Sequence, residues 1–142
     1  MIESRKEVRP LLVEIPFRVQ TYDVDFAGVM SNIVYIRWLE DLRVKVLDEY
    51  LPLDALLAQG ISPLLARTEI NYRRPLRLDD RPIGRMWVSK IGRASSVLSA
   101  EFSLDGVIVA DARQVGTFIT LATGRPIPLP RALRDQYAAM AS

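Results

Sequence analysis

The sequence predicts an α+β fold in which an antiparallel sheet lies over one long central helix. Three observations predict it: one alternating apolar segment near the N-terminus, then one amphipathic segment of about five helical turns, then four long strand-like segments in succession. This order is typical of an antiparallel sheet packed on a single helix. The chain has 142 residues, which is enough for one domain with one core.

The first strand and the long helix are predicted by the spacing of their apolar residues. A strand is expected within residues 12–24, where Ile15, Phe17 and Val19 alternate with polar residues. From residue 32 to residue 51 the period changes to three or four, which is the spacing of a helix face that packs against a core. The apolar residues of that face are Ile36, Leu39, Leu42, Val46 and Tyr50.

The remaining elements follow from turn residues. Residues 53–59 are expected to form a short helical turn that ends at Gly60. Asp105-Gly106 lies between two alternating segments, which predicts a hairpin and makes the last two strands antiparallel neighbours. A short C-terminal helix is expected at 131–140. The four later strands are expected at residues 61–74, 81–91, 94–104 and 107–121, giving a five-stranded sheet.

Composition limits the classes of protein to consider. Apolar residues make up 49% of the chain and charged residues 25%, and no apolar run approaches the ~18 residues of a membrane span. A net charge of +2 gives no footprint for nucleic acid. The first residues carry charges of both signs and no apolar signal region, so we expect a cytoplasmic protein with residues 1–10 as a flexible tail before a single domain at 11–142.

The sequence contains no His and no Cys. This removes Ser-His-Asp and Cys-His catalysis, an imidazole general base and the Cys- and His-based zinc sites. Acid–base or nucleophilic chemistry therefore falls to carboxylates, Tyr, Lys, Ser or water. No metal and no dissociable cofactor is expected.

Asp25 is the leading catalytic candidate, because it stands between the first strand and the long helix. A helix that begins near Ser31-Asn32 directs free backbone N–H groups and the positive end of its dipole toward this segment. A carbonyl could be polarised there while a carboxylate attacks it. The competing interpretation makes Asp25 a helix N-cap, although Ser31 or Asn32 is better placed to cap. For Asp23, a turn hydrogen bond is the favoured role.

Two further features concern partners. The segment 71–82 is rich in Arg and includes Tyr72, so it could hold phosphates, or it could be a charged strand edge that discourages aggregation.

One helix covers only part of one face of a sheet with long strands. An uncovered edge of this kind is normally paired with a second copy, which predicts a homo-oligomer.

Residues 22–38 resemble the signature of the 4-hydroxybenzoyl-CoA thioesterase-like family of hotdog-fold enzymes. That family has a strand ending in Asp-x-Asp, then x-x-Gly, a short turn, and a helix with Tyr and an aromatic residue, matched here by Tyr22-Asp-Val-Asp-Phe-Ala-Gly and by Tyr35 and Trp38. The segments 71–80 and 91–96 also resemble the family's. The resemblance implies a hotdog fold, in which the sheet wraps around the long helix.

The resemblance also implies roles for particular residues. Asp25 takes the place of the family's nucleophile or general base, and the backbone N–H of Asn32 takes that of the donor to the thioester oxygen. Arg93 and Ser95 fall in a turn that contacts the CoA phosphates in some relatives. Substrate contacts are also expected from Gly28, Ser31 and Tyr35.

The function implied is hydrolysis of an acyl-CoA thioester to free acid and CoA, in a dimer or a dimer of dimers (homotetramer) with the site at the dimer interface. One departure from the family stands out: Val29-Met30-Ser31 occupies a turn where many relatives have His. Two alternatives stay open. One is a hotdog protein that binds an acyl thioester or an aromatic ligand without hydrolysing it. The other is a hotdog dehydratase, which the absence of His disfavours.

Overall fold

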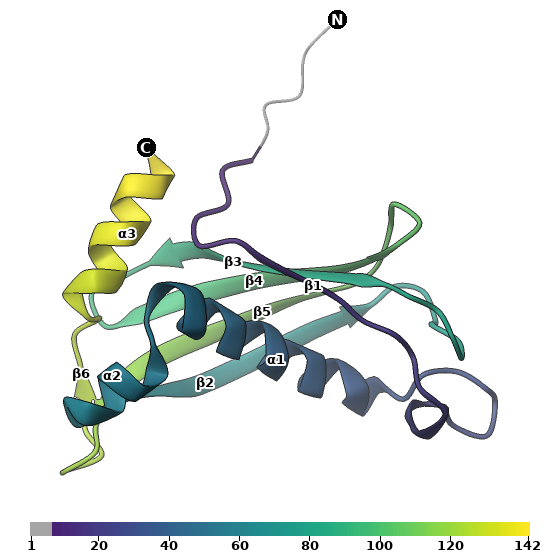
Figure 1. Cartoon of the computed structure of the whole chain (residues 1–142), viewed down its shortest axis with the longest axis horizontal. Coiled ribbons are helices and arrows are strands. Elements are labelled where there is room, and N and C mark those ends of the chain that lie inside the picture. Colours follow the sequence, from purple (N-terminus) through teal and green to yellow (C-terminus); the bar gives the residue numbers. More distant parts are fainter. Residues whose placement is uncertain (1–6) are drawn as a thin grey trace, which may run out of the picture.

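The computed structural model describes residues 7–142, and residues 1–6 of the expected tail lie outside that range. The chain runs through β1 (Val13–Pro16), η1 (Thr21–Asp23), α1 (Asn32–Tyr50), α2 (Leu53–Ala58), β2 (Ile61–Tyr72), β3 (Ile83–Ile91), β4 (Ser95–Leu104), β5 (Val107–Thr120), β6 (Pro126–Ile127) and α3 (Arg131–Ala141). One sheet has the order β1-β3-β4-β5-β2 with antiparallel neighbours. The long helix α1 lies across one face of it (Figure 1).

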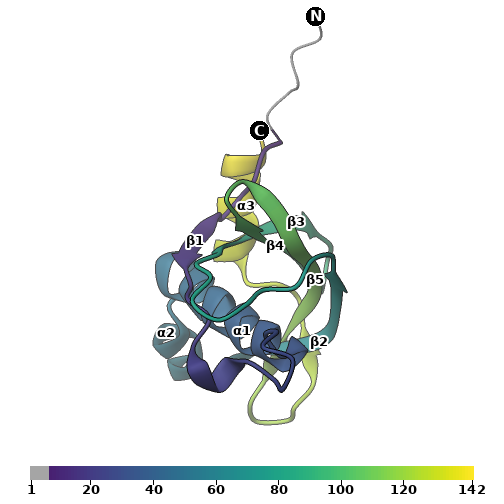
Figure 2. The same ribbon diagram turned by 90° about the vertical axis from the view of Figure 1, so that its right-hand side faces the viewer.

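The α+β fold with a sheet around one long helix is confirmed. Figure 2 shows the sheet curving around α1, with β1 and β2 at its two edges. The sheet has six strands rather than the expected five, because Pro126 and Ile127 pair with β5 as β6. Two residues are too few for an alternating pattern to reveal a strand.

The core lies between α1 and the sheet. Leu39 and Leu42 of α1 are fully buried, as are Met86 of β3 and Phe102 of β4. Ile36 was expected on the buried face of the helix but is 53% exposed. Tyr35 takes the buried position instead, and Ile36 points about 100° away from it around the helix axis.

The edges of the sheet differ in length. The first strand is shorter than the segment 12–24 in which it was predicted, because β1 has only four residues. Beyond β1, the Phe17 N–H and the Val19 N–H still donate to Pro82 O and Asp80 O. At the other edge β2 has 12 residues and pairs only with β5 within the described chain. The long unpaired edge expected from the sequence is therefore the outer edge of β2.

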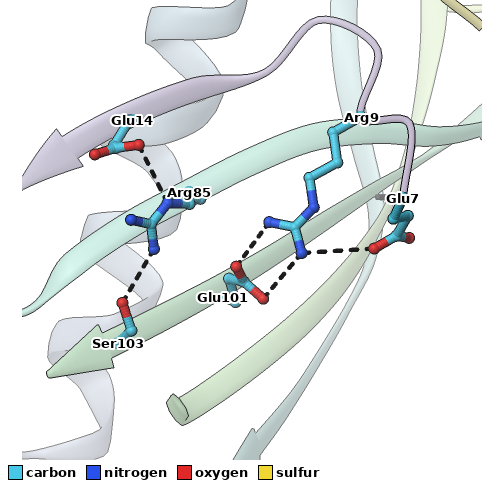
Figure 3. A network of polar contacts seen from close by, with 6 residues as sticks. All are labelled: Glu7, Arg9, Glu14, Arg85, Glu101 and Ser103. Atoms are coloured by element: carbon cyan, nitrogen blue, oxygen red, sulfur yellow. Dashed lines mark hydrogen bonds and ion pairs between the residues drawn. The ribbon is translucent and has the colours of Figure 1, made fainter. Parts of the chain in front are cut away.

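The face of the sheet that points away from α1 carries a polar network (Figure 3). Arg9 donates to Glu101 at 2.7 Å, and its guanidinium lies 3.9 Å above the ring of Trp87. Arg85 donates to Glu14 and Ser103, which ties β1 to β3 and β4 (Figure 3). Residues just before β1 are thus held against the outer face, while the domain boundary expected at residue 11 stays a prediction.

Candidate functional site

Asp25 begins a tight turn that leads into α1. Its backbone N–H donates to Val29 O at 2.9 Å, and the Gly28 N–H donates to Asp25 O at 3.0 Å. Gly28 has φ +74°, a left-handed conformation that glycine adopts without a steric penalty. The glycine thus lets the chain reverse between Asp25 and the helix.

The Asp25 carboxylate is exposed, and one of its two oxygens accepts hydrogen bonds within the turn. Its Oδ1 accepts the N–H groups of Ala27 at 2.9 Å and Val29 at 3.3 Å. Its Oδ2 accepts no hydrogen bond from residues 7–142. One oxygen therefore fixes the side chain to the turn, and the other is available to a substrate or a water molecule.

Asp23 has the structural role that the sequence favoured. It is 6% exposed, its Oδ2 accepts the Gln20 N–H at 2.8 Å, and its carbonyl accepts the Ser31 N–H at 2.8 Å. These contacts join the η1 turn to the start of the long helix. Asp23 therefore sets the position of the segment that carries Asp25.

The N-terminus of α1 has a free donor. Ser31 is the N-cap, and its Oγ accepts the Ile33 N–H at 3.4 Å while its carbonyl accepts the Val34 N–H. Asn32 is the first helical residue, and its N–H has no acceptor among the described residues. The positive end of the helix dipole reinforces this N–H as a site for a partial negative charge.

A cavity of about 250 Å³ adjoins this helix start, and we call it the Tyr35 cavity. The Tyr35 hydroxyl is buried and has no hydrogen-bond partner among the described residues. Burial raises its pKa to about 12, and the nearby Tyr72 acts in the same direction. The rings of Tyr35 and Tyr72 lie 5.5 Å apart. The cavity is lined by Val29, Met30, Asn32, Tyr35, Tyr72, Arg73, Arg74, Pro75 and Leu76.

Five of the seven expected site residues lie together at the start of α1. Asn32 and Tyr35 line the Tyr35 cavity, and Asp25, Gly28 and Ser31 belong to the adjoining segment. Sequence reasoning named Tyr72 within a basic segment but not as a wall of this cavity. The pairing of β2 with β5 brings Tyr72 there, and no local pattern in the sequence records that pairing.

Arg93 and Ser95 lie at the opposite end of the molecule, in and just after the turn between β3 and β4 (Figure 1). The Arg93 carbonyl accepts the Leu129 N–H at 3.0 Å and also bonds to the Arg134 guanidinium. The nine residues of β3 span roughly 30 Å. One chain therefore does not bring Arg93 next to Asp25.

Residues 7–142 contain neither a cluster of metal-binding side chains nor a membrane-spanning helix. Among them, no three His, Cys, Asp or Glu residues are grouped so as to hold a metal ion. No helix in the described part of the chain is long and apolar enough to cross a membrane.

Comparisons with known proteins agree with this architecture. The model of the thioesterase-like superfamily matches residues 19–137. The long-chain acyl-CoA thioesterase FadM of Escherichia coli (strain K12) is 27% identical over 130 residues, which cover 90% of this chain and 98% of the relative.

Two solved structures extend the comparison. The probable thioesterase YbaW from Escherichia coli superposes with a TM-score of 0.80 at 27% identity, covering 91% of this chain and 98% of that one. A thioesterase from Thermus thermophilus, solved with coenzyme A and Zn, has a TM-score of 0.79 at 26% identity, covering 93% and 95%. The expected hotdog architecture is confirmed, and because the family model spans most of the sequence, this chain belongs to the thioesterase-like superfamily.

Proposed function

We propose that this protein hydrolyses acyl-CoA thioesters to the free acid and CoA. One observation carries the proposal: the N–H of Asn32, at the positive end of α1, lies directly after a turn that presents Oδ2 of Asp25, and neither group has a hydrogen-bond partner among residues 7–142. A donor for a developing oxyanion and a carboxylate that can attack or activate water are the two groups that thioester hydrolysis needs. The names of FadM and of the coenzyme A-bound thioesterase support the same substrate class.

Two routes use these groups. In the first, an oxygen of Asp25 attacks the thioester carbon, the carbonyl oxygen takes the developing negative charge against the Asn32 N–H, and the C–S bond breaks to release CoA thiolate. Water then hydrolyses the mixed anhydride. In the second, Asp25 takes a proton from a water molecule that attacks the same carbon, and the C–S bond then breaks to give the free acid and CoA thiolate. In both routes the Tyr35 hydroxyl is protonated near neutral pH, as a tyrosine is at its ordinary pKa of about 10, and burial raises that pKa further to about 12.

The functional unit in this proposal is a homodimer that pairs through β2, and two such dimers form a homotetramer. The Ile61 end of β2 lies beside β5 residue Thr120, on the side of the molecule that carries Arg93, and its Tyr72 end lies against Tyr35. An antiparallel pairing of two β2 strands would bring the Arg93 end of one subunit toward the Asp25 end of the other. CoA would then contact both chains.

Exposed apolar residues near Asp25 support an interface there. Phe26 is fully exposed, and Ile33 and Ile36 of α1 are 58% and 53% exposed. Large apolar side chains left exposed to this extent are typical of a surface that contacts another protein. A partner at this surface would also shield the exposed Asp25 carboxylate from bulk water.

The experiment that tests the proposed activity is release of free thiol from aromatic, short-chain and long-chain acyl-CoAs. Wild type is compared with Asp25→Asn and with Asp48→Asn, which changes an exposed carboxylate elsewhere on α1. Asp25→Asn should lower kcat by about a hundredfold or more with an unchanged thermal unfolding midpoint, whereas Asp48→Asn should behave as wild type. Binding of CoA esters without thiol release by wild type would contradict hydrolysis and indicate a binding protein.

A further inference from the structure

A second cavity lies between the C-terminal half of α1 and the sheet, and we call it the Gly116 cavity. Its volume is about 50 Å³, and its surface is almost wholly apolar. Packed protein cores contain few voids larger than a water molecule, so a space of this size is a distinct feature of the core. Its wall includes Val46 and Leu47 from α1, Leu98 from β4, Gly116 and Phe118 from β5, and Leu133 from α3.

The polar side chains in this wall are short or already paired. The Nη2 atom of Arg43 donates to both oxygens of Glu40 at 2.9 Å, and the Thr117 hydroxyl donates to Leu64 O at 3.2 Å. Ser96 contributes only a short side chain. Because an apolar wall favours hydrocarbon over water, the cavity suits an aliphatic group.

Gly116 keeps the cavity open on the sheet side. It lies in the interior of β5, where it pairs with Ser96 of β4 and Leu65 of β2. Its φ is not in the left-handed region, and an added methyl group would lie 3.4 Å from Ser96 Oγ and 3.8 Å from Leu98 Cδ1, which are ordinary contacts. Neither backbone nor packing therefore requires glycine here. Glycine within a strand often marks a place where a ligand approaches the backbone closely.

The size of the cavity limits what it can hold. An engineered apolar cavity of about 150 Å³ binds one benzene molecule. The Gly116 cavity has about a third of that volume, so it is too small for an aromatic ring. A few carbons at the end of a narrow alkyl chain fit this space.

The cavity is reached from the free edge of β2. Pro63 and Leu64 of β2 form part of its wall, and Leu64 is 47% exposed. On α1, the fully buried Leu39 and Leu42 lie between this cavity and the Tyr35 cavity of the same chain. The Ile61 half of β2 meets the Asp25 end of the partner subunit in the proposed dimer. A chain that enters from the β2 edge therefore comes from the partner's reaction site.

We propose that the Gly116 cavity holds the end of an unbranched aliphatic acyl chain whose thioester lies at the Asp25 end of the partner subunit. The inference rests on the proposed function for the thioester and for the pairing through β2. Short acyl groups end before the cavity, and an aromatic end is too wide for it. Each methylene that moves from water into the cavity strengthens binding by about fourfold.

The competing explanation is a packing void that no ligand enters. Filling such a void would change the stability of the protein and leave the affinity for every chain length the same. A test must therefore compare chain lengths in variants that change the size of the cavity.

The test measures the Kd of non-hydrolysable S-alkyl-CoA thioethers by calorimetry, in a series of straight chains from butyl to octadecyl. For wild type, Kd should fall by about fourfold per methylene over the lengths at which the chain end enters the cavity, and then level off. Gly116→Ala fills the space of about one methyl group. It should weaken binding of the long chains by about fourfold and leave butyl-CoA binding unchanged.

Val97→Ile is the matched control, because it also adds one carbon to a central strand. Val97 alternates with Ser96 and Leu98 along β4, so its side chain lies on the other face of the sheet. Its profile of Kd against chain length should equal that of wild type. Unfolding midpoints of all variants show that each is folded at the temperature of the measurement.

Leu98→Ala tests the opposite change, since it enlarges the cavity. Its Kd should continue to fall at lengths where wild type has levelled off. An alkyl chain that ends in a phenyl ring should bind wild type at least about tenfold more weakly than a straight chain of equal reach, and Leu98→Ala should reduce that difference.

Identical length profiles for wild type and Gly116→Ala would overturn the inference, and so would equal weakening of short and long chains by Gly116→Ala. Thiol release from the matching thioesters separates the two proposals. A length profile that depends on Gly116, without any hydrolysis, would contradict only the proposed reaction. Hydrolysis with a length profile that Gly116→Ala leaves unchanged would contradict only the role of the cavity.

Discussion

Asp23 and Asp25 are two residues apart in the chain and have different surroundings. Asp23 is buried, and its carboxylate and carbonyl hold the turn to the start of α1. Asp25 is exposed and keeps one oxygen free of hydrogen bonds to described residues. Asp23 ends the η1 turn and is buried, whereas Asp25 begins the next turn and is exposed, so burial assigns a structural role to Asp23 and leaves the Asp25 carboxylate accessible.

Tyr35 provides a test of pH dependence at the scale of one residue. Its pKa is raised to about 12 in the folded protein, against about 10 in an unfolded chain. Between these values the unfolded state has lost the proton and the folded state still holds it, so folding stability should fall as the pH rises from about 10 to 12. Below pH 10 both states are protonated and this contribution does not change.

Tyr35→Phe isolates that effect. Chemical denaturation of wild type and variant across this pH range should show the wild type losing on the order of 2 kcal/mol more stability than the variant. At pH 7 the variant should be at least as stable as wild type, because the lost hydroxyl is buried and has no partner among the described residues. Parallel profiles of stability against pH for the two proteins would show that the pKa of Tyr35 is the same in the folded and unfolded states.

At the scale of the element, the N-terminus of α1 combines structural and chemical roles. Ser31 has φ −62° and ψ 138° and caps the helix, which leaves Asn32 as the first helical residue. Proline fits well at a first helical position, because the N–H that it lacks has no partner inside the helix. Extended backbone before a proline is also the preferred conformation, and Ser31 already has it.

Asn32→Pro therefore removes the proposed oxyanion donor while preserving the helix. We expect kcat to fall by roughly a hundredfold to a thousandfold, the effect of losing one oxyanion donor, with a normal circular dichroism spectrum. Asn32→Ala is the control, since it deletes the side chain and keeps the N–H, and it should retain most of the activity. If Asn32→Pro hydrolyses thioesters at the wild-type rate, this N–H does not polarise the carbonyl.

The elements also show which features the sequence could predict. The Asp105-Gly106 hairpin and the long helix were predicted correctly, because turn residues and apolar spacing are local signals. Strand β6 was missed because two residues carry no periodicity. Ile36 was assigned to the wrong face because two adjacent apolar residues, Tyr35 and Ile36, compete for one buried position.

The site was predictable only where its residues are close in sequence. Asp25, Ser31 and Asn32 lie within one short segment, and the structure keeps them together. Tyr72 reaches Tyr35 through strand pairing across the sheet, which a local pattern does not encode.

At the scale of the whole molecule, the separation of Asp25 from Arg93 becomes a prediction about subunits. The two residues lie at opposite ends of β3, which spans roughly 30 Å, so a single site that uses both must take them from different chains. Asp25→Asn should be inactive. Arg93→Ala should raise KM for CoA esters more than for thioesters that lack the nucleotide, because an exposed guanidinium suits phosphate.

Mixing the two variants tests whether the chains share a site. A hybrid dimer of Asp25→Asn and Arg93→Ala subunits has one site in which both residues are intact and one in which both are changed. Random pairing makes half of the dimers hybrid, so activity at low substrate should recover to roughly a quarter of the wild-type value. Mixing Asp25→Asn with wild type supplies the control, in which activity is only diluted. If Asp25 and Arg93 served the same chain, every site in the variant mixture would keep a defect, and activity would not rise above that of the Arg93→Ala subunits alone.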